Sequence, residues 1–329
     1  PQYAISRLQK AAFAKDIKRH GMEELKMKTK KLCALLLAVL LILAICAGCS
    51  SNSAGNDTAN PDNSGDNTDS NVAETVELKV SSTDAVERTS VQLLEEFKTA
   101  VEEKTEGRVT ISIFPAGQLG ETNVVLQSVI SGDVDILDAY VDPTFDPMLD
   151  VMGVNYLVTN YDDMKMLLSD ESNFTKINRE AFERIGVDFV GYFLEGFVGA
   201  GAVKVPDNYN VVGPKEGVTY RIPQSECTKI QLTDLGFNLV SIAWADVYTS
   251  LQTGVCDGAL ALTPENVYVQ LGDVCPYYIP YNFGIEIHHY CLSKAVKDKL
   301  SEEDYNTVVD CLREIGQKSI DIAEENEAQ

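Results

Sequence analysis

The residue best suited to chemistry in this sequence is Arg221, near the end of the apolar stretch Val218–Ile222 and two residues before Pro223. Its guanidinium is permanently charged and offers a planar fork of donors that matches the two oxygens of a carboxylate. The alternative is a surface arginine paired with a glutamate, but an arginine within apolar sequence beside a proline seldom serves only solubility. Arg221 therefore predicts a binding site for a small organic acid.

Other polar side chains could complete such a site. Gln224 follows Arg221 by three residues and Thr83 follows the first apolar segment, so both are candidate hydrogen-bond donors. Two weaker candidates are Thr122 and Tyr140, of which the tyrosine could equally be a buried strand residue. The acid Asp138 ends an apolar strand, where it could face the cleft and bind an ammonium group or hydroxyls, or else cap a turn.

Catalysis finds little support in the sequence. Beyond the N-terminal segments discussed below, the histidines are His288 and His289, which point to opposite faces if they lie on a strand. No nucleophile elbow, phosphate-binding loop or metal cluster is evident. We therefore expect neither an enzyme nor a bound cofactor or metal.

Cysteine usage is equally uninformative. Five cysteines remain outside the N-terminal segments, an odd number without C-x-x-C spacing, which disfavours a zinc site. Buried free thiols are expected, with one disulfide among Cys256, Cys275 and Cys291 as the alternative. The five are Cys227, Cys256, Cys275, Cys291 and Cys311.

The chain is strongly acidic, with a formal net charge of -23, and the part after residue 48 carries 18 basic and 47 acidic residues. Such a balance, with no basic stripe, excludes nucleic acid as a partner. It keeps a secreted protein soluble but repels anions. An anion site must therefore be locally basic, which increases the weight on Arg221.

The N-terminal segment Met27–Gly48 has a basic start and an apolar run that ends at small residues before Cys49. This pattern predicts a secretory signal, and the cysteine indicates a lipoprotein lipidated at Cys49. An uncleaved membrane anchor is the alternative, since the run is near the minimum length for spanning. In the lipoprotein interpretation, the lipid on Cys49 would hold the protein on the outer face of the cytoplasmic membrane, in a periplasm or on a Gram-positive surface.

The remaining segments divide at clear changes of composition. Residues 1–26 precede a normal signal start and are interpreted as an over-long translation start or fusion remnant. Residues 49–75 are polar and predict a disordered tether. Residues 76–329 are long enough for one two-lobed unit or two small domains.

Within residues 76–329, strand-like and helix-like periodicities alternate, which predicts an α/β fold with largely parallel sheets. Helices are expected at Val91–Thr105, Asn123–Ser131, Asp162–Leu168, Ser172–Ile185, Glu226–Leu235, Ala245–Thr253 and Glu302–Glu325. Strands are expected at Val76–Ser82, Arg108–Phe114, Val134–Ala139, Phe189–Phe193, Gly199–Val205, Val218–Ile222, Leu239–Ile242, Ala259–Ala261, Tyr277–Phe283 and Ile287–Ser293. Ligands of open α/β sheets bind at the carboxyl ends of strands, where the polar candidates lie.

Three segments in order resemble a known family. Glu102–Gly120 is similar to E-x-T-x-G-R-V-x-V-x-x-F-P-x-G-Q-L-G, Val129–Asp135 reads VISGDVD, and Gly217–Gly258 resembles K-x-R-V-P followed by E-V-Y-x-A-L-Q-x-G-x-V-D-G. These patterns are those of solute-binding proteins of tripartite ATP-independent periplasmic (TRAP) transporters, and the resemblance covers nearly all of Val76–Ala323. It implies a two-lobed periplasmic-binding-protein-like fold, with hinge-connected lobes and a long helix.

The resemblance also implies roles for individual residues. Arg221 matches the carboxylate-binding arginine of R-V-P, and Trp244 stands where an aromatic covers the ligand, although it could instead pack in the core. A second arginine, in G-F-R, is replaced by Val198. The asparagine of V-D-G-x-E-N is replaced by Ala261, and Asn266 could substitute only with a local shift. The expected pocket is less cationic and more apolar than one for a dicarboxylate.

The function implied is capture of a small organic acid or amino-acid-like ligand and its delivery to TRAP membrane subunits. The ligand could be a monocarboxylate, a keto or aromatic acid, an amino acid or a sugar acid. Two alternatives stay open: a lipoprotein that presents ligand to a sensor, and an ABC-type binding protein. Because family members usually continue past the long helix, we expect a C-terminal truncation.

Overall fold

The computed structural model describes residues 75–327. The expected upstream extension, signal peptide, lipidated Cys49, nearly all of the tether and the last two residues lie outside this range. Among the described residues, no helix combines the length and apolar character needed to cross a membrane.

A mixed sheet of eight strands runs through the described chain in the order β2-β1-β3-β8-β4-β7-β5-β6. Strand β1 pairs in parallel with β2 and β3, and β5 pairs in parallel with β6 and β7, but the central pair β4 and β8 is antiparallel. The largely parallel sheet expected from the sequence is therefore confined to two outer groups. The strands are β1 Val76–Ser82, β2 Val109–Phe114, β3 Ile136–Ala139, β4 Val187–Ala202, β5 Tyr220–Ile222, β6 Leu239–Ser241, β7 Gly258–Leu262 and β8 Tyr277–Ser293.

Strands β4 and β8 are each continuous, where the sequence predicted two shorter strands apiece. Their pairing shifts register between Leu194 and Gly196 and again between Val198 and Ala200. Gly196 has a φ of 136°, which other residues rarely adopt, and a Cβ on Gly199 would meet the Ile279 carbonyl oxygen. These glycines lie at bulges of the long two-stranded connection.

The helices follow the predicted apolar periodicity closely. Ser172 and Ser225 cap α5 and α6 by accepting from the amides of Thr175 and Thr228. The sequence analysis did not predict the short elements η1, η2 and α8. The elements are α2 Thr89–Lys104, α3 Thr122–Ser131, η1 Pro147–Gly153, α4 Tyr161–Leu167, α5 Asn173–Ile185, α6 Glu226–Asp234, α7 Trp244–Thr253, η2 Asn266–Gln270, α8 Val296–Lys299 and α9 Glu302–Glu327.

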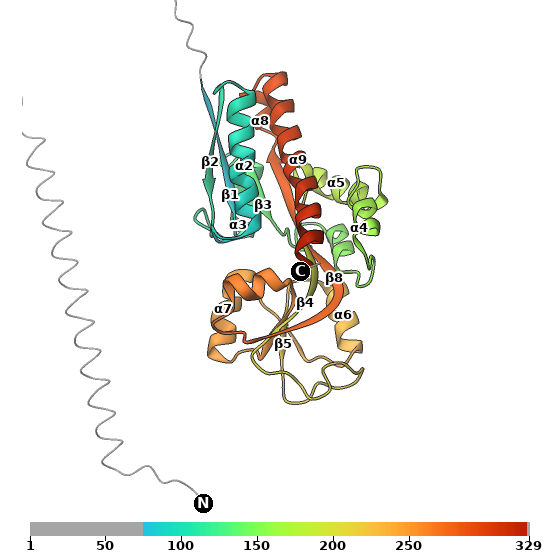
Figure 1. Ribbon diagram of the computed structural model, residues 1–329. Coiled ribbons are helices and arrows are strands. Elements are labelled where there is room, and N and C mark those ends of the chain that lie inside the picture. The colour runs from blue at the N-terminus through green and yellow to red at the C-terminus, as the bar shows by residue number, and fades with distance from the viewer. Residues whose placement is uncertain (1–74, 328–329) are drawn as a thin grey trace, which may run out of the picture. The chain divides into compact units, whose positions relative to one another are not determined.

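The apolar core is divided into four clusters, two for each end of the central strand pair. The first lobe is built from β1–β3 with α2, α3, α5 and α9, and the second from β5–β7 with α6 and α7; β4 and β8 pass between them (Figure 1). Each lobe thus has its own core on both faces of its sheet, as two-lobed folds require. All five described cysteines are free thiols, so the alternative of a disulfide is wrong.

Candidate functional site

A cavity of about 490 Å³ lies at the strand ends where the two lobes meet. Of the residues predicted from the sequence, seven line it, and they come from both lobes: Thr83, Thr122, Tyr140, Arg221, Gln224, Trp244 and Ala261. Other lining residues were not predicted, including Asp84, Glu195, Gln270, Glu286 and His288.

Arg221 is the middle residue of β5, between Tyr220 and Ile222 in the core of the second lobe, which explains its apolar sequence context. The residue is 4% exposed, and its Nε donates to the Ile242 carbonyl oxygen at 2.8 Å. No carboxylate among the described residues forms an ion pair with it. Burial lowers the pKa of Arg221 to about 10, so it stays a cation at neutral pH. Its outer nitrogens are therefore available to a ligand.

Trp244 begins α7, and its ring centroid lies 6.0 Å from the Arg221 guanidinium carbon. The indole is half-buried and packs against the core of the second lobe while it also lines the cavity. It contacts the cation and borders the cavity at once. Trp244 therefore forms an apolar wall beside Arg221.

Ala261 lies on β7 with a φ of 60°, a left-handed conformation that is uncommon for a residue with a side chain. Asn266, which was expected to reach the site only through a local shift, does line the cavity. Its side-chain amide is committed to the protein, however, because Nδ2 donates to Glu195 at 2.9 Å. The amide thus holds a wall of the cavity in place.

Two predicted residues are not brought to the cavity. Asp138 is fully buried: it accepts from Ser82 Oγ at 2.9 Å and lies 3.0 Å from His288 Nδ1. Because the His288 imidazole already pairs with the Asp138 carboxylate, Asp138 is not free to hold an ammonium group. Val198 is 2% exposed and belongs to the apolar core of the second lobe, since a bulge turns its side chain inward.

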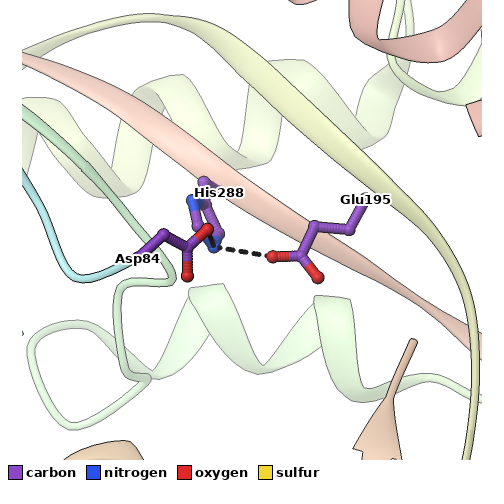
Figure 2. A group of neighbouring side chains, drawn as sticks. All are labelled: Asp84, Glu195 and His288. Carbon is purple, nitrogen blue, oxygen red and sulfur yellow. Dashed lines mark ion pairs between the residues drawn. The ribbon is translucent and has the colours of Figure 1, made fainter. Parts of the chain in front are cut away.

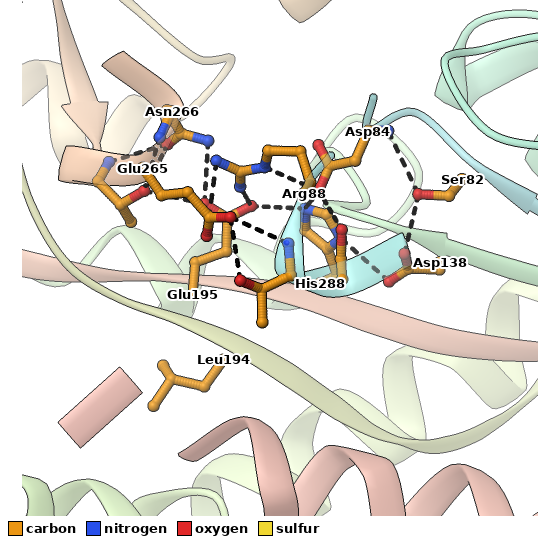
Figure 3. Close-up of polar contacts among 12 residues, drawn as sticks. Ser82, Asp84, Arg88, Asp138, Leu194, Glu195, Glu265, Asn266 and His288 are labelled. Atoms are coloured by element: carbon orange, nitrogen blue, oxygen red, sulfur yellow. Dashed lines mark hydrogen bonds and ion pairs between the residues drawn. The ribbon is translucent and has the colours of Figure 1, made fainter. Parts of the chain in front are cut away.

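A buried set of charges that was not predicted from the sequence includes three residues of the cavity wall, Asp84, Glu195 and His288. Figure 3 shows their contacts with Arg88 and Asp138. We call this set the Arg88 cluster: Asp84, Arg88, Asp138, Glu195 and His288. Arg88 is fully buried, forms an ion pair with Glu195 and donates through Nε to Asp84 at 3.4 Å. His288 Nε2 lies 3.3 Å from Glu195 Oε1. Every charge in the cluster has an opposite charge beside it.

Electrostatics within the Arg88 cluster follow from this pairing. Burial by itself disfavours the charged form of Glu195, but Arg88 and His288 outweigh burial and hold its pKa below the ordinary range. Burial likewise disfavours the imidazolium of His288, yet Asp138 and Asp84 raise its pKa well above the usual value. The neighbouring His289 has no such partner, and burial lowers its pKa to about 3. One histidine is therefore charged and the other neutral, on opposite faces of β8.

Asp84, Glu195 and His288 offer ligand atoms within 4.8 Å of one another, a set that could hold a metal ion (Figure 2). The chemistry of the donors argues against it. His288 is protonated, with Nδ1 on Asp138 and Nε2 on Glu195, which leaves no lone pair for a metal. The Arg88 guanidinium already neutralises Glu195. The three residues are accounted for as an ion-pair network.

Glu286, on β8, is a half-buried acid of the cavity wall that differs from Asp84 and Glu195. No hydrogen bond or ion pair joins its carboxylate to any described residue, although it lines the cavity. Burial, with the negative charge of Glu195 adding to it, raises the pKa of Glu286 to about 8. A usable signal was present: Glu195 and Glu286 are acids set within apolar sequence, the same feature that drew attention to Arg221.

A cavity between two lobes, open to both and lined by an unpaired cation, is typical of proteins that bind small solutes. The chain belongs to the DctP family, the family 7 bacterial extracellular solute-binding proteins, whose model matches residues 80–329. The resemblance to TRAP transporter solute-binding proteins is thereby confirmed. This family consists of transport proteins rather than enzymes.

Relatives agree with this assignment. A solute-binding protein of Chromohalobacter salexigens is 26% identical over 232 residues, which are 65% of this chain and 63% of that protein, so less than two thirds of the relative is matched. A TRAP periplasmic solute-binding protein from Desulfovibrio salexigens, solved with orotic acid, has a TM-score of 0.68 at 20% identity over 77% of this chain and 80% of that one. One from Sulfurospirillum deleyianum, solved with succinate, has a TM-score of 0.68 at 21% identity, covering 77% and 82%. These structures confirm the two-lobed α/β fold.

Proposed function

We propose that the protein captures a small organic acid outside the cytoplasm and delivers it to the membrane subunits of a TRAP transporter. The observation that carries this is the Arg221 guanidinium, which borders the cavity without a carboxylate partner in a strongly acidic chain. The related structures hold orotic acid and succinate, both of which carry carboxylates. Ligand would bridge the lobes, with Trp244 covering its apolar part and Thr83, Thr122 and Gln224 offering polar groups.

The test is a thermal-shift screen of wild-type protein over mono-, di- and aminocarboxylates, followed by titration through Trp244 fluorescence. Removing one partner of a buried charge pair costs about 2–5 kcal/mol, so Arg221→Ala should weaken binding by roughly two to three decades. Arg221→Lys should also bind poorly, because an ammonium cannot reproduce two parallel hydrogen bonds. Unaltered affinity in Arg221→Ala would refute the assignment.

We further propose that Cys49 is lipidated and tethers the protein to the outer face of the membrane. The support is the sequence alone: an apolar run that ends at small residues before this cysteine. Cys49→Ala should move the protein from the membrane to the soluble fraction after cell fractionation. If the variant stays in the membrane with its signal attached, the lipoprotein interpretation is wrong.

A further inference from the structure

Two opposite charges border the same cavity without partners. The outer nitrogens of Arg221 have no acceptor among the described residues, and the Glu286 carboxylate has no donor. They are not an ion pair with each other, since no nitrogen of Arg221 lies within 4.0 Å of a Glu286 oxygen. Arg221 is buried and Glu286 is half-buried, and charges removed from water are costly when they lack a partner. Both positions therefore favour a ligand that supplies the missing opposite charge.

We infer that the ligand is a zwitterion, an aminocarboxylate whose carboxylate binds Arg221 and whose ammonium group binds Glu286. This rests on the proposed function, because the same arginine takes the carboxylate in both. A simple monocarboxylate would leave Glu286 unmatched. A dicarboxylate would bring a second negative charge toward Glu286 and Glu195, which like charges disfavour.

Other acids near the cavity cannot take this role. The Glu195 carboxylate already has Arg88 and His288 at one oxygen, and Thr263 Oγ1 at 3.1 Å and Asn266 Nδ2 at 2.9 Å at the other. Asp84 accepts from Ser90 Oγ at 2.5 Å and Gln270 Nε2 at 3.4 Å, besides Arg88. Asp142 accepts from the Thr144 amide at 2.8 Å, and Glu121 lacks a side-chain partner but is exposed. Glu286 is the half-buried carboxylate of the cavity wall that the described residues leave without a hydrogen bond or ion pair.

The groups around Glu286 predict how pH acts on such binding. The charged groups that act on it are Glu195 on β4, His288 beside it on β8, Arg221 on β5 and Asp84 after β1. Because its pKa is about 8 without ligand, the carboxyl is largely protonated at pH 6 and must lose a proton to pair with an ammonium group. Affinity for an aminocarboxylate should therefore rise by about tenfold per pH unit below pH 8.

The experiment uses matched pairs of ligands that differ in the amino group: leucine and 2-hydroxy-4-methylpentanoate, phenylalanine and phenyllactate, 5-aminovalerate and valerate. Wild type, Glu286→Gln and Arg221→Ala are titrated by calorimetry at pH 6 and pH 8. Gln is a close match in shape to the protonated carboxyl, so the variant removes only the negative charge. Glu121→Gln, at an exposed acid of the cavity rim, is the control for general electrostatics.

We expect at least one amino member to bind wild type roughly tenfold or more tightly than its counterpart at pH 8. Glu286→Gln should abolish that preference and its pH dependence, Glu121→Gln should keep both, and Arg221→Ala should lose both ligands of the pair. If the ligands without the amino group bind more tightly, or if Glu286→Gln keeps the preference for the amino ligands, the inference of a zwitterionic ligand is wrong while the proposed function stands. If no carboxylate of this panel or of the broader screen binds, both proposals fail.

Discussion

The Arg88 cluster, three of whose members line the cavity, and the pair Arg221 and Glu286 differ in how their charges are compensated. In the cluster, Arg88 and His288 outweigh burial at Glu195 and hold its pKa below the ordinary range, whereas burial raises the pKa of Asp84. Glu286 lies in the same region of the protein, but burial raises its pKa to about 8 because no hydrogen bond or ion pair stabilises its carboxylate. We therefore infer that the paired charges hold the cavity wall in place and propose that the unpaired ones bind a ligand.

The largest expected effect is on the free energy of unfolding, when a paired arginine is removed instead of an unpaired one. Arg88→Ala should lower the free energy of unfolding by about 3–5 kcal/mol, because it leaves Glu195 and Asp84 buried without their cation. Arg221→Ala removes a cation that has no protein carboxylate, so its apo stability should change far less. Urea denaturation of the two variants measures both.

Arg108→Ala is the control for losing an arginine as such. Its side chain is 35% exposed and pairs with Asp304 at 2.8 Å, and exposed pairs contribute about 0–1 kcal/mol. If Arg88→Ala were no more destabilising than Arg108→Ala, the Arg88 cluster would not hold the wall. If Arg221→Ala were as destabilising as Arg88→Ala, the distinction between paired and unpaired charge would be lost.

A smaller effect separates the two histidines of β8. His289 is buried and neutral, accepting from the Val141 amide at 3.2 Å, and burial followed by the charge on His288 lowers its pKa to about 3. The folded pKa lies below the unfolded value, so unfolding takes up a proton and His289 costs stability as pH falls from about 6.5 toward 3. The cost is about 1 kcal/mol per pH unit between pH 6 and pH 4.

The measurement compares wild type with His289→Gln, whose side-chain oxygen can still accept from Val141. Glu286 and the other titrating groups contribute to both proteins, so they cancel in the difference. The stability of the variant relative to wild type should rise as pH falls through this window. A difference that does not vary with pH would mean that His289 titrates normally.

The sequence predicted the cation of the site better than its anions. Arg221 was found because a charge within apolar sequence needs a reason, and the helices and most strands followed from periodicity. Arg88 was missed because it lies one residue before a helix where arginines are usually solvated, and its partner Glu195 is distant in sequence. Pairing between such residues is set by the fold, so local pattern cannot show it. The continuity of β4 and β8 was missed because glycines mark bulges as well as ends.

The smallest expected effect concerns a contact that joins the lobes at the edge of the Arg88 cluster, where Glu265 Oε2 lies 3.9 Å from Arg88. Glu265 Oε1, after β7, accepts from the backbone N and Oγ1 of Thr89 at 2.9 and 3.0 Å, at the first turn of α2. A carboxylate at a helix N-terminus is favourable, and this one couples the second lobe to the first. If ligand binding stabilises this arrangement of the lobes, Glu265→Ala should weaken affinity by about fivefold, for a contact worth roughly 1 kcal/mol. The loss should fall mainly on the dissociation rate, measured by stopped-flow Trp244 fluorescence, and Thr89→Val, which keeps the backbone donor, should show less of it. An unchanged dissociation rate in Glu265→Ala would place this contact outside the closure of the lobes on ligand.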